Sequence, residues 1–213
     1  AFTLATTLMK EPSRLRLLEI NGTVTNLDSF LNQLSDKPKL FSISFCSCEF
    51  LQQHLEALSS FMSNSSVRAL EFHNAVTPQA LTYFHDSFFT GMQLTSLSLD
   101  GTPGLYLSRI LNRLQNLIFL SVADCKLEIG DFLLQLKVLP NLRAVNLSGN
   151  RCSQLNTPLP PSIISLYANR VKWENGTLTE FFKFRVMKLS MSYAEASAKD
   201  WTFFYDTILE NPN

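Results

Sequence analysis

The sequence predicts an α/β fold, in which a parallel β-sheet forms one side and mostly helical segments form the other, built from about eight repeated units. Two observations lead to this expectation. A short pattern of apolar residues recurs along the whole chain, and most copies are followed by an apolar stripe with helical spacing. Because each unit would stack on the next, residues 1–213 are expected to form a single arc-shaped domain.

The pattern is clearest between Leu142 and Asn150. Leu142, Val145 and Leu147 take its first, fourth and sixth positions, and Asn150 takes the ninth. Side chains alternate between the two faces of a strand, so the fourth and sixth residues point into the core and the third, fifth and seventh point outward. An asparagine or cysteine at the ninth position can hydrogen-bond backbone groups that the turn after the strand leaves unpaired.

The same pattern begins at eight places, separated by 21 to 27 residues. The first positions are Leu15, Leu40, Val67, Leu94, Leu117, Leu142, Ile163 and Val186. Every fourth and sixth position is apolar: Leu18 and Ile20, Ile43 and Phe45, Leu70 and Phe72, Leu97 and Leu99, Leu120 and Val122, Val145 and Leu147, Leu166 and Ala168, and Leu189 and Met191. The ninth position is irregular, with Thr23, Cys48, Ala75, Thr102, Cys125, Asn150, Val171 and Ala194. The prediction therefore depends on the strand positions and the period.

These offsets resemble the signature of the leucine-rich-repeat family, L-x-x-L-x-L-x-x-N/C-x-L, whose period is about 20–29 residues. The resemblance covers essentially the whole chain. It implies a solenoid with a parallel sheet on its concave side and, as in ribonuclease-inhibitor-like members, mostly helices on its convex side. It also implies that a ligand binds the concave strands, but it leaves the ligand undefined.

The segments after the strands carry the stripes of half-buried helices. Asn26 is expected to cap the first helix, and Thr77 with Pro78 to begin the third. In the sixth unit Pro158, Pro160 and Pro161 exclude a helix, so that connection should be extended. The expected stripes are Leu27, Phe30, Leu31 and Leu34; Leu51, Leu55, Leu58 and Met62; Leu81, Phe84 and Phe88; Leu107, Ile110, Leu111 and Leu114; Phe132, Leu133 and Leu136; Leu178, Phe181 and Phe182; and Trp201, Phe204, Tyr205 and Ile208.

Composition argues against several classes of protein. The 18 basic and 18 acidic residues give zero net charge, whereas a nucleic-acid-binding protein needs a concentrated basic surface. No apolar run approaches the roughly 18 residues of a membrane span. We find no cofactor-binding motif, so neither a cofactor nor a metal is expected.

The cysteines indicate a reducing compartment. Cys48, Cys125 and Cys152 fall in the turns that follow strands, and no clustered terminal pairs occur of the kind that close extracellular leucine-rich proteins. The spacing of Cys46 and Cys48 fits half a metal site, but no second pair or histidine cluster completes it. We therefore expect reduced structural thiols in a cytoplasmic protein.

Four N-glycosylation sequons, at Asn21, Asn64, Asn146 and Asn175, would instead fit a secreted protein. Asn146 lies in the middle of an expected strand, which is a poor position for a glycan. We interpret the four as chance matches, and a secreted or cell-surface recognition receptor remains the alternative.

The outward positions are mostly small and polar, which suits either a closely approaching partner or a solvated sheet without one. Phe119 and Tyr167, with Asn146 between them, are expected to anchor a contact patch, because aromatic residues dominate interface energies. Glu71, His73 and Asp100, with Arg68 nearby, are expected to form an electronegative, titratable cluster. The predicted protein-binding residues are Glu71, His73, Asp100, Phe119, Asn146, Tyr167, Asn169 and Lys188.

The same cluster allows an enzymatic hypothesis. His73 and Asp100 could act as a base and its orienting carboxylate, with Ser98 or Ser121 as nucleophile. An open sheet without a nucleophile elbow, a glycine-rich anion loop or a lid is a poor setting for such chemistry, and serines occur throughout this surface. We therefore expect no catalysis.

The expected function is a cytoplasmic, non-enzymatic scaffold that binds a partner protein across the concave sheet. By analogy with intracellular leucine-rich proteins it would regulate the cytoskeleton or a small GTPase, although no motif selects between these. An array without polar caps exposes its core at both ends, so the chain is expected to be a piece of a longer array. Its ends or its concave face could also join copies of the chain.

Overall fold

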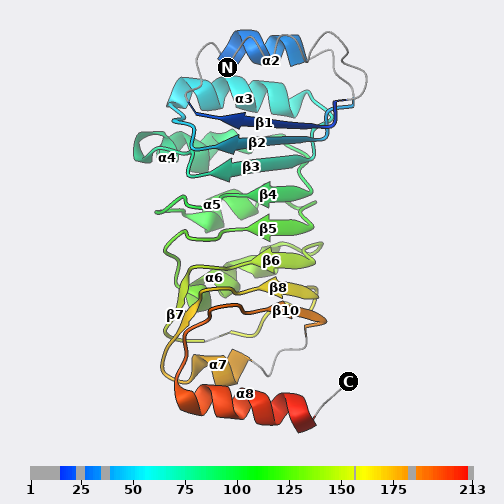
Figure 1. Cartoon of the computed structure of the whole chain (residues 1–213). Helices are drawn as coiled ribbons and strands as arrows, with labels where there is room; N and C mark the ends of the chain where they lie inside the picture. The colour runs from blue at the N-terminus through cyan, green and yellow to red at the C-terminus, as the bar shows by residue number, and fades with distance from the viewer. Residues whose placement is uncertain (1–14, 23–26, 35–38, 156, 182–185, 211–213) are drawn as a thin grey trace.

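The computed structural model describes residues 15–22, 27–34, 39–155, 157–181 and 186–210. Within them lies one sheet of eight parallel strands that follow one another in chain order (Figure 1). The strands are β1 (Leu17–Asn21), β2 (Ser42–Cys46), β3 (Ala69–His73), β4 (Ser96–Ser98), β5 (Phe119–Ser121), β6 (Ala144–Asn146), β8 (Ser165–Tyr167) and β10 (Lys188–Ser190). The predicted α/β fold with a parallel sheet is confirmed.

Neighbouring strands pair so that equivalent positions of successive units stand side by side. Ile43 pairs with Leu70, for example, and Leu120 with Val145. The side chains at these fourth positions point into one continuous core, where Ile43, Leu97 and Val145 are fully buried. Only the outermost strands differ, because Leu18 and Leu189 have a neighbouring strand on one side and are half-buried. The register predicted from the apolar pattern is therefore correct.

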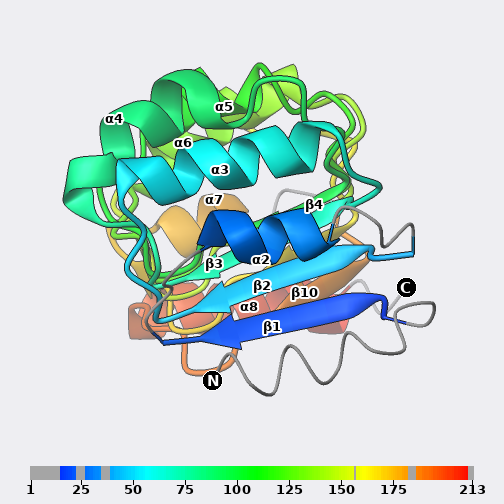
Figure 2. The ribbon, with the colours of Figure 1, turned by 90° about the horizontal axis from the view of Figure 1, so that it is seen from above.

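The helices α2 to α6 cover one face of the sheet and leave the other face open (Figure 2). They are α2 (Leu27–Leu34), α3 (Gln52–Ser63), α4 (Leu81–Tyr83), α5 (Leu107–Leu111) and α6 (Ile129–Gln135), followed along the chain by α7 (Thr177–Phe181) and α8 (Ala198–Glu210). Short 3-10 or π turns add η2 (Pro78–Ala80), η3 (Phe84–Phe88) and η4 (Leu136–Val138). Most of the predicted stripes are buried, because each packs on the strand of its own unit.

Two expected stripe residues are exposed. Leu51 is 49% exposed because α3 begins one residue later and Leu51 is its N-cap. Tyr205 is 61% exposed on the outer side of α8. Thr23, Asn26 and Phe182 lie outside the described residues, as does the side chain of Ile208.

The proline-rich connection of the sixth unit contains no helix among its described residues, as predicted. The chain also forms a second, two-stranded parallel sheet of β7 (Arg151–Cys152), which follows β6, and β9 (Lys172–Trp173), which follows β8. Isolated parallel bridges join Phe50 to Val76 and Glu128 to Arg151 in other units. Sequence reasoning missed these pairings because two residues are too few to show an alternating pattern.

The ninth positions carry a recurring hydrogen bond. The amide nitrogen of Asn150 donates to Val122 O at 2.8 Å and Ser148 O at 3.2 Å, which are the sixth-position carbonyl of the preceding unit and the seventh of its own. Cys48 and Cys125 donate to the equivalent carbonyls through their thiols, over 3.2 to 3.5 Å. Asparagine and cysteine can therefore both make this recurring bond, because both can donate into the turn.

All four cysteines are free thiols, and three of them are buried. Burial raises the pKa of Cys125 to about 12 and that of Cys152 to about 11, which keeps both protonated and able to donate hydrogen bonds. None of the helices described is long and apolar enough to cross a membrane.

A cluster of phenylalanines fills the core beneath β2 and β3. The ring of Phe72 lies 5.7 Å from that of Phe45, 5.3 Å from Phe50, 5.6 Å from Phe84 and 5.8 Å from Phe88, measured between centroids. All five rings are fully buried. Phe72 thus connects its own strand to the preceding unit and to η3 of its own unit.

His85, in η3, is 3% exposed and holds the following connection in place. Its Nε2 accepts a hydrogen bond from the backbone N–H of Tyr106 at 3.1 Å, so this nitrogen carries no proton. Burial lowers the pKa of His85 below its usual 6.5, against an opposing effect of the neighbouring Asp86 carboxylate.

The folded protein is therefore expected to lose stability as the pH falls from 7.5 to 5.5. The unfolded chain protonates His85 near pH 6.5, while the folded chain takes up that proton only at lower pH. Acid thus favours the unfolded state, and the effect is absent well above pH 6.5. Urea unfolding at the two pH values measures it. His85→Gln retains an acceptor but does not titrate, so its stability should fall less, and an unchanged pH dependence in this variant would refute the assignment.

Candidate functional site

The predicted binding residues lie on the face of the sheet that the helices leave open, which we call the open face. It consists of the third, fifth and seventh positions of successive units. Glu71 and His73 come from β3, Asp100 follows β4, Asn146 belongs to β6, and Asn169 follows β8. Phe119, Tyr167 and Lys188 come from β5, β8 and β10.

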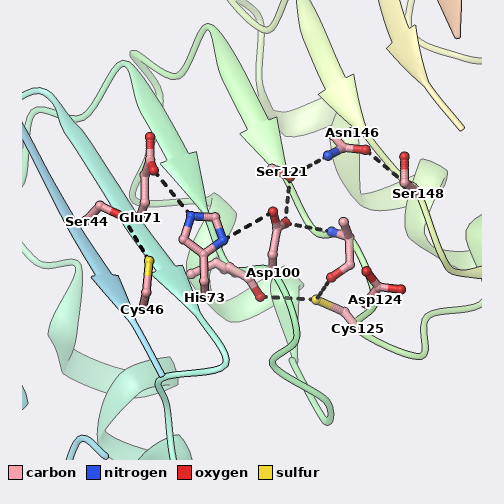
Figure 3. Close-up of polar contacts among 12 residues, drawn as sticks. Ser44, Cys46, Glu71, His73, Asp100, Ser121, Asp124, Cys125, Asn146 and Ser148 are labelled. Carbon is pink, nitrogen blue, oxygen red and sulfur yellow. Dashed lines mark hydrogen bonds and ion pairs between the residues drawn. The ribbon is translucent and has the colours of Figure 1, made fainter. Parts of the chain in front are cut away.

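The acidic cluster forms as expected around His73. Its Nε2 lies 3.3 Å from Glu71 Oε2 and its Nδ1 lies 3.6 Å from Asp100 Oδ2, so the imidazole bridges two carboxylates (Figure 3). Arg68 does not join them. Its guanidinium donates to the backbone carbonyls of Ser65 and Val67, ahead of β3. Arg68 precedes β3, whereas Glu71 lies within β3 and Asp100 follows β4.

A hydrogen-bonded network continues from Asp100 across the next strands. Asp100 Oδ1 accepts the hydroxyl of Ser121 at 2.6 Å and the backbone N–H of Ala123 at 2.8 Å. The amide nitrogen of Asn146 donates to Ser121 Oγ at 2.9 Å, and its oxygen accepts the N–H of Ser148 at 3.1 Å (Figure 3). Asp100 is thus held by groups of the next unit, and Asn146 by Ser121 of the preceding unit and by the backbone of its own.

The network extends to the last described strand with the same geometry. Ser148 Oγ accepts the N–H of Asn169 at 3.1 Å. Asn169 Oδ1 in turn accepts Ser190 Oγ at 2.8 Å and the N–H of Ser192 at 2.7 Å. Asn169 therefore repeats the role of Asp100, since both seventh-position side chains accept from the serine and the backbone N–H of the following unit.

The two serines of the enzymatic hypothesis are not placed for nucleophilic attack. Ser121 donates its hydroxyl proton to Asp100 and is 2% exposed, and Ser98 is 4% exposed with no hydrogen-bond partner for its hydroxyl. Both nitrogens of His73 face carboxylates, and no hydrogen bond links them to either serine. This arrangement positions polar groups but does not make a nucleophile and its base.

The aromatic candidates share the open face but occupy different positions in the register. Asn146 pairs directly with Tyr167, whereas Phe119 pairs with Ala144, two residues nearer the strand start. Lys188 extends over the ring of Tyr167, with Nζ 5.1 Å from its centroid, in a cation–π contact. Tyr167 is therefore braced by Lys188, a contact that the sequence did not predict.

A hollow of about 490 Å³ opens where β5, β6 and β8 end. Asp100, Asn146 and Asn169 line it together with Asp124, Arg170 and Tyr193, which occupy eighth positions. The Asp124 carboxylate accepts Arg170 Nη2 at 2.9 Å, although one whole unit lies between them. The candidate site thus includes residues beyond the seven strand positions considered in the sequence.

The backbone conformation at the eighth position explains how Arg170 can contact Asp124 across a whole unit. Its residue has a positive φ in all eight units, whether it is glycine, as at Gly149 (+67°), or not, as at Asp124 (+54°) and Arg170 (+54°). A Cβ atom at Gly149 would lie 1.9 Å from Asp124 Oδ1, so the Asp124–Arg170 pair requires glycine between them. Gly22, Gly101 and Gly149 share this column, a sequence feature that could have indicated the turn but was not used to predict it.

No protein-family model and no curated protein matches this chain in sequence. Function must therefore be argued from the open face itself. Among the described residues no group of three or more His, Cys, Asp or Glu side chains is arranged to hold a metal ion. What the open face offers is a row of fixed donors, acceptors and partly exposed rings.

Proposed function

We propose that this chain is a leucine-rich-repeat solenoid that acts as a non-enzymatic scaffold and binds a partner protein across the concave, open face. The observation that carries the proposal is the network of hydrogen bonds and ion-pair contacts from Glu71 to Ser190, which crosses six consecutive strands. Side chains held in one orientation lose little entropy on binding, so a preorganised polar face can bind with useful affinity.

The leucine-rich-repeat assignment is supported by features of the turns as well as the strands. The residue at the eighth position of each unit has a positive φ. Asn150, Cys48 and Cys125, at ninth positions, donate hydrogen bonds into equivalent turns. Such agreement between units is expected of stacked repeats, in which each unit contacts mainly its neighbours. The strands also lie in the sheet in their order along the chain, and each pairs with those of the neighbouring units.

The interface with the partner protein would be mostly polar, with only a few aromatic residues that become buried. Phe119 and Tyr167 are the half-buried aromatic residues of the open face, and Tyr167 is braced by Lys188. Rings of this kind become buried at the centre of interfaces, while surrounding polar groups exclude water. A cytoskeletal protein or a small GTPase is our preferred class of partner, by analogy with intracellular leucine-rich proteins.

A cytoplasmic location is supported by the four free cysteines, since secreted proteins of this size usually form disulfides. The alternative, a secreted receptor, is favoured by one observation: Asn21, Asn64 and Asn175 are exposed and accessible to glycosylation. Asn146 is half-buried and its amide is engaged with Ser121. Intact-mass measurement of protein from its native cells distinguishes the two, because glycans would add mass to the secreted form only.

Site-specific photo-crosslinking tests the binding face. p-Benzoylphenylalanine is placed at Phe119 or Tyr167 on the open face, and at Tyr106 or Tyr205 on the helical side as matched controls. We expect one partner protein to be cross-linked in extracts of native cells from both open-face positions and from neither control. Cross-links from the helical side alone, equal cross-links from both sides, or none at all would refute the proposal.

A further inference from the structure

The edge of the sheet where the strands begin carries a second set of aligned side chains. Each second-position carbonyl accepts the second-position N–H of the next unit: Arg68 O from Thr95, Thr95 O from Ile118, and Ile118 O from Arg143, over 2.8 to 2.9 Å. These four residues therefore stand in consecutive order along the sheet. This edge lies at the opposite end of the strands from the hollow lined by Asp100 and Asn169.

An open groove of about 470 Å³ follows these residues, with Arg68 at one end and Arg143 at the other. Ile118, which is 48% exposed, lies between them. Amide side chains line the groove in the preceding column, where Asn116 Nδ2 donates to Gln93 Oε1 at 2.7 Å. The groove thus has a basic group at each end and an apolar residue within it.

Among the described residues the two arginines have no carboxylate partner. Arg68 donates to the carbonyls of Ser65 and Val67, and Arg143 to that of Ser162. No Asp or Glu lies within 4.0 Å of either guanidinium in the described part of the chain, whereas three other arginines there form ion pairs. Carbonyl bonds leave the positive charge uncompensated and most of the five guanidinium N–H groups available.

Charge is unevenly distributed along the strands, although Arg170, at an eighth position, pairs with Asp124 beyond the strand ends. In the described units the residues just before the strands, and the first three positions, include Arg16, Lys39, Arg68, Arg143 and Lys188 but neither Asp nor Glu. The carboxylates of the open side, Glu19, Glu71, Asp100 and Asp124, all lie at the fifth position or beyond. The groove edge is therefore a basic strip, and the complementary ligand is acidic.

We propose that this groove binds an extended segment of another protein that carries two acidic side chains four residues apart. Arg68 and Arg143 are separated by three interstrand steps, which is about 14 Å at roughly 4.8 Å per step. An extended peptide rises about 3.3 Å per residue, so residues i and i+4 are about 13 Å apart and point to the same side. Carboxylates at i and i+4 thus meet the two guanidiniums, and an apolar residue at i+2 packs on Ile118.

The probe is a fluorescein-labelled peptide in which two glutamates flank a Ser-Val-Ser core, titrated with the whole chain and followed by fluorescence anisotropy. We expect saturable binding that weakens with salt, since the guanidiniums are solvent-accessible. Arg143→Gln should weaken binding about fivefold or more. Arg109→Gln is the matched control, because it removes the same charge from a helical-side arginine already paired with Asp86, and it should leave binding unchanged.

Three results would overturn the proposal. One is that a peptide with glutamine in place of both glutamates, or with the two glutamates adjacent, binds as tightly. Another is that Arg109→Gln weakens binding as much as Arg143→Gln, which would indicate a general charge effect. The last is that the groove binds a different ligand. An oligonucleotide would then bind more tightly than the peptide, or the chain would self-associate with increasing concentration and Arg143→Gln would abolish that association. None of these depends on whether the open face binds a partner.

Discussion

Replacing Phe72 with alanine is expected to lower the free energy of unfolding by about 3–5 kcal/mol, the range found when a fully buried aromatic side chain is removed. Phe72 is 0% exposed and its ring contacts those of Phe45, Phe50, Phe84 and Phe88. The cavity would lie between two units, because the strands of both units pack against these rings. Urea unfolding followed by circular dichroism measures the change.

Two further variants serve as controls for Phe72→Ala. Phe72→Leu retains most of the apolar volume and should cost clearly less than the alanine variant. Phe203→Ala, on the surface of α8 where the side chain is 41% exposed, should change stability little. If Phe72→Ala and Phe203→Ala were equally mild, the aromatic cluster would not hold these units together.

Asn150→Ala is expected to cost about 3 kcal/mol, because it leaves several buried backbone groups without partners at roughly 1–3 kcal/mol each. The side-chain amide donates to Val122 O, Leu147 O and Ser148 O, and its oxygen accepts the N–H of Leu127 at 3.0 Å. Asn150 itself is 5% exposed, so water cannot replace these bonds without opening the turn. The same unfolding measurement applies.

The chain supplies its own control for this position. Asn150→Cys places a thiol where Cys48 and Cys125 stand in other units, so it should restore donation to the two recurring carbonyls. It cannot accept from Leu127 N–H. We therefore expect a loss between that of the alanine variant and zero; a cysteine variant as unstable as the alanine variant would mean that the recurring bond contributes nothing.

The strands and their register could be predicted because burial imposes a strict alternation on each of them. A shift of one residue would place Ile43 or Val145 on the open face, so the apolar pattern leaves one solution. The acidic cluster followed from the same argument, since Glu71, His73 and Asp100 occupy known positions on adjacent strands. Helices were harder to place at their ends, as Leu51 shows, because capping depends on backbone groups rather than on an apolar stripe.

The remaining contacts depend on directions that a linear pattern does not encode. Lysine and arginine side chains are long, so Lys188 extends over Tyr167 and Arg170 extends over Gly149 to Asp124. The contacts of Arg68 were not predicted for the same reason, because its side chain bonds the carbonyls of Ser65 and Val67. Sequence reasoning also assumed that outward serines are exposed, whereas neighbouring side chains cover Ser98 and Ser121.

The basic strip at the strand starts and the carboxylates at the strand ends have a kinetic consequence. The basic strip at one margin and Glu19, Glu71 and Asp100 toward the other produce a transverse electric dipole over the open side, which Arg170 beside Asp124 reduces, even though the chain has no net charge. Such a dipole orients a charged molecule as it approaches, so association would be faster and would favour one orientation. Dissolved ions screen the dipole and would reduce both effects.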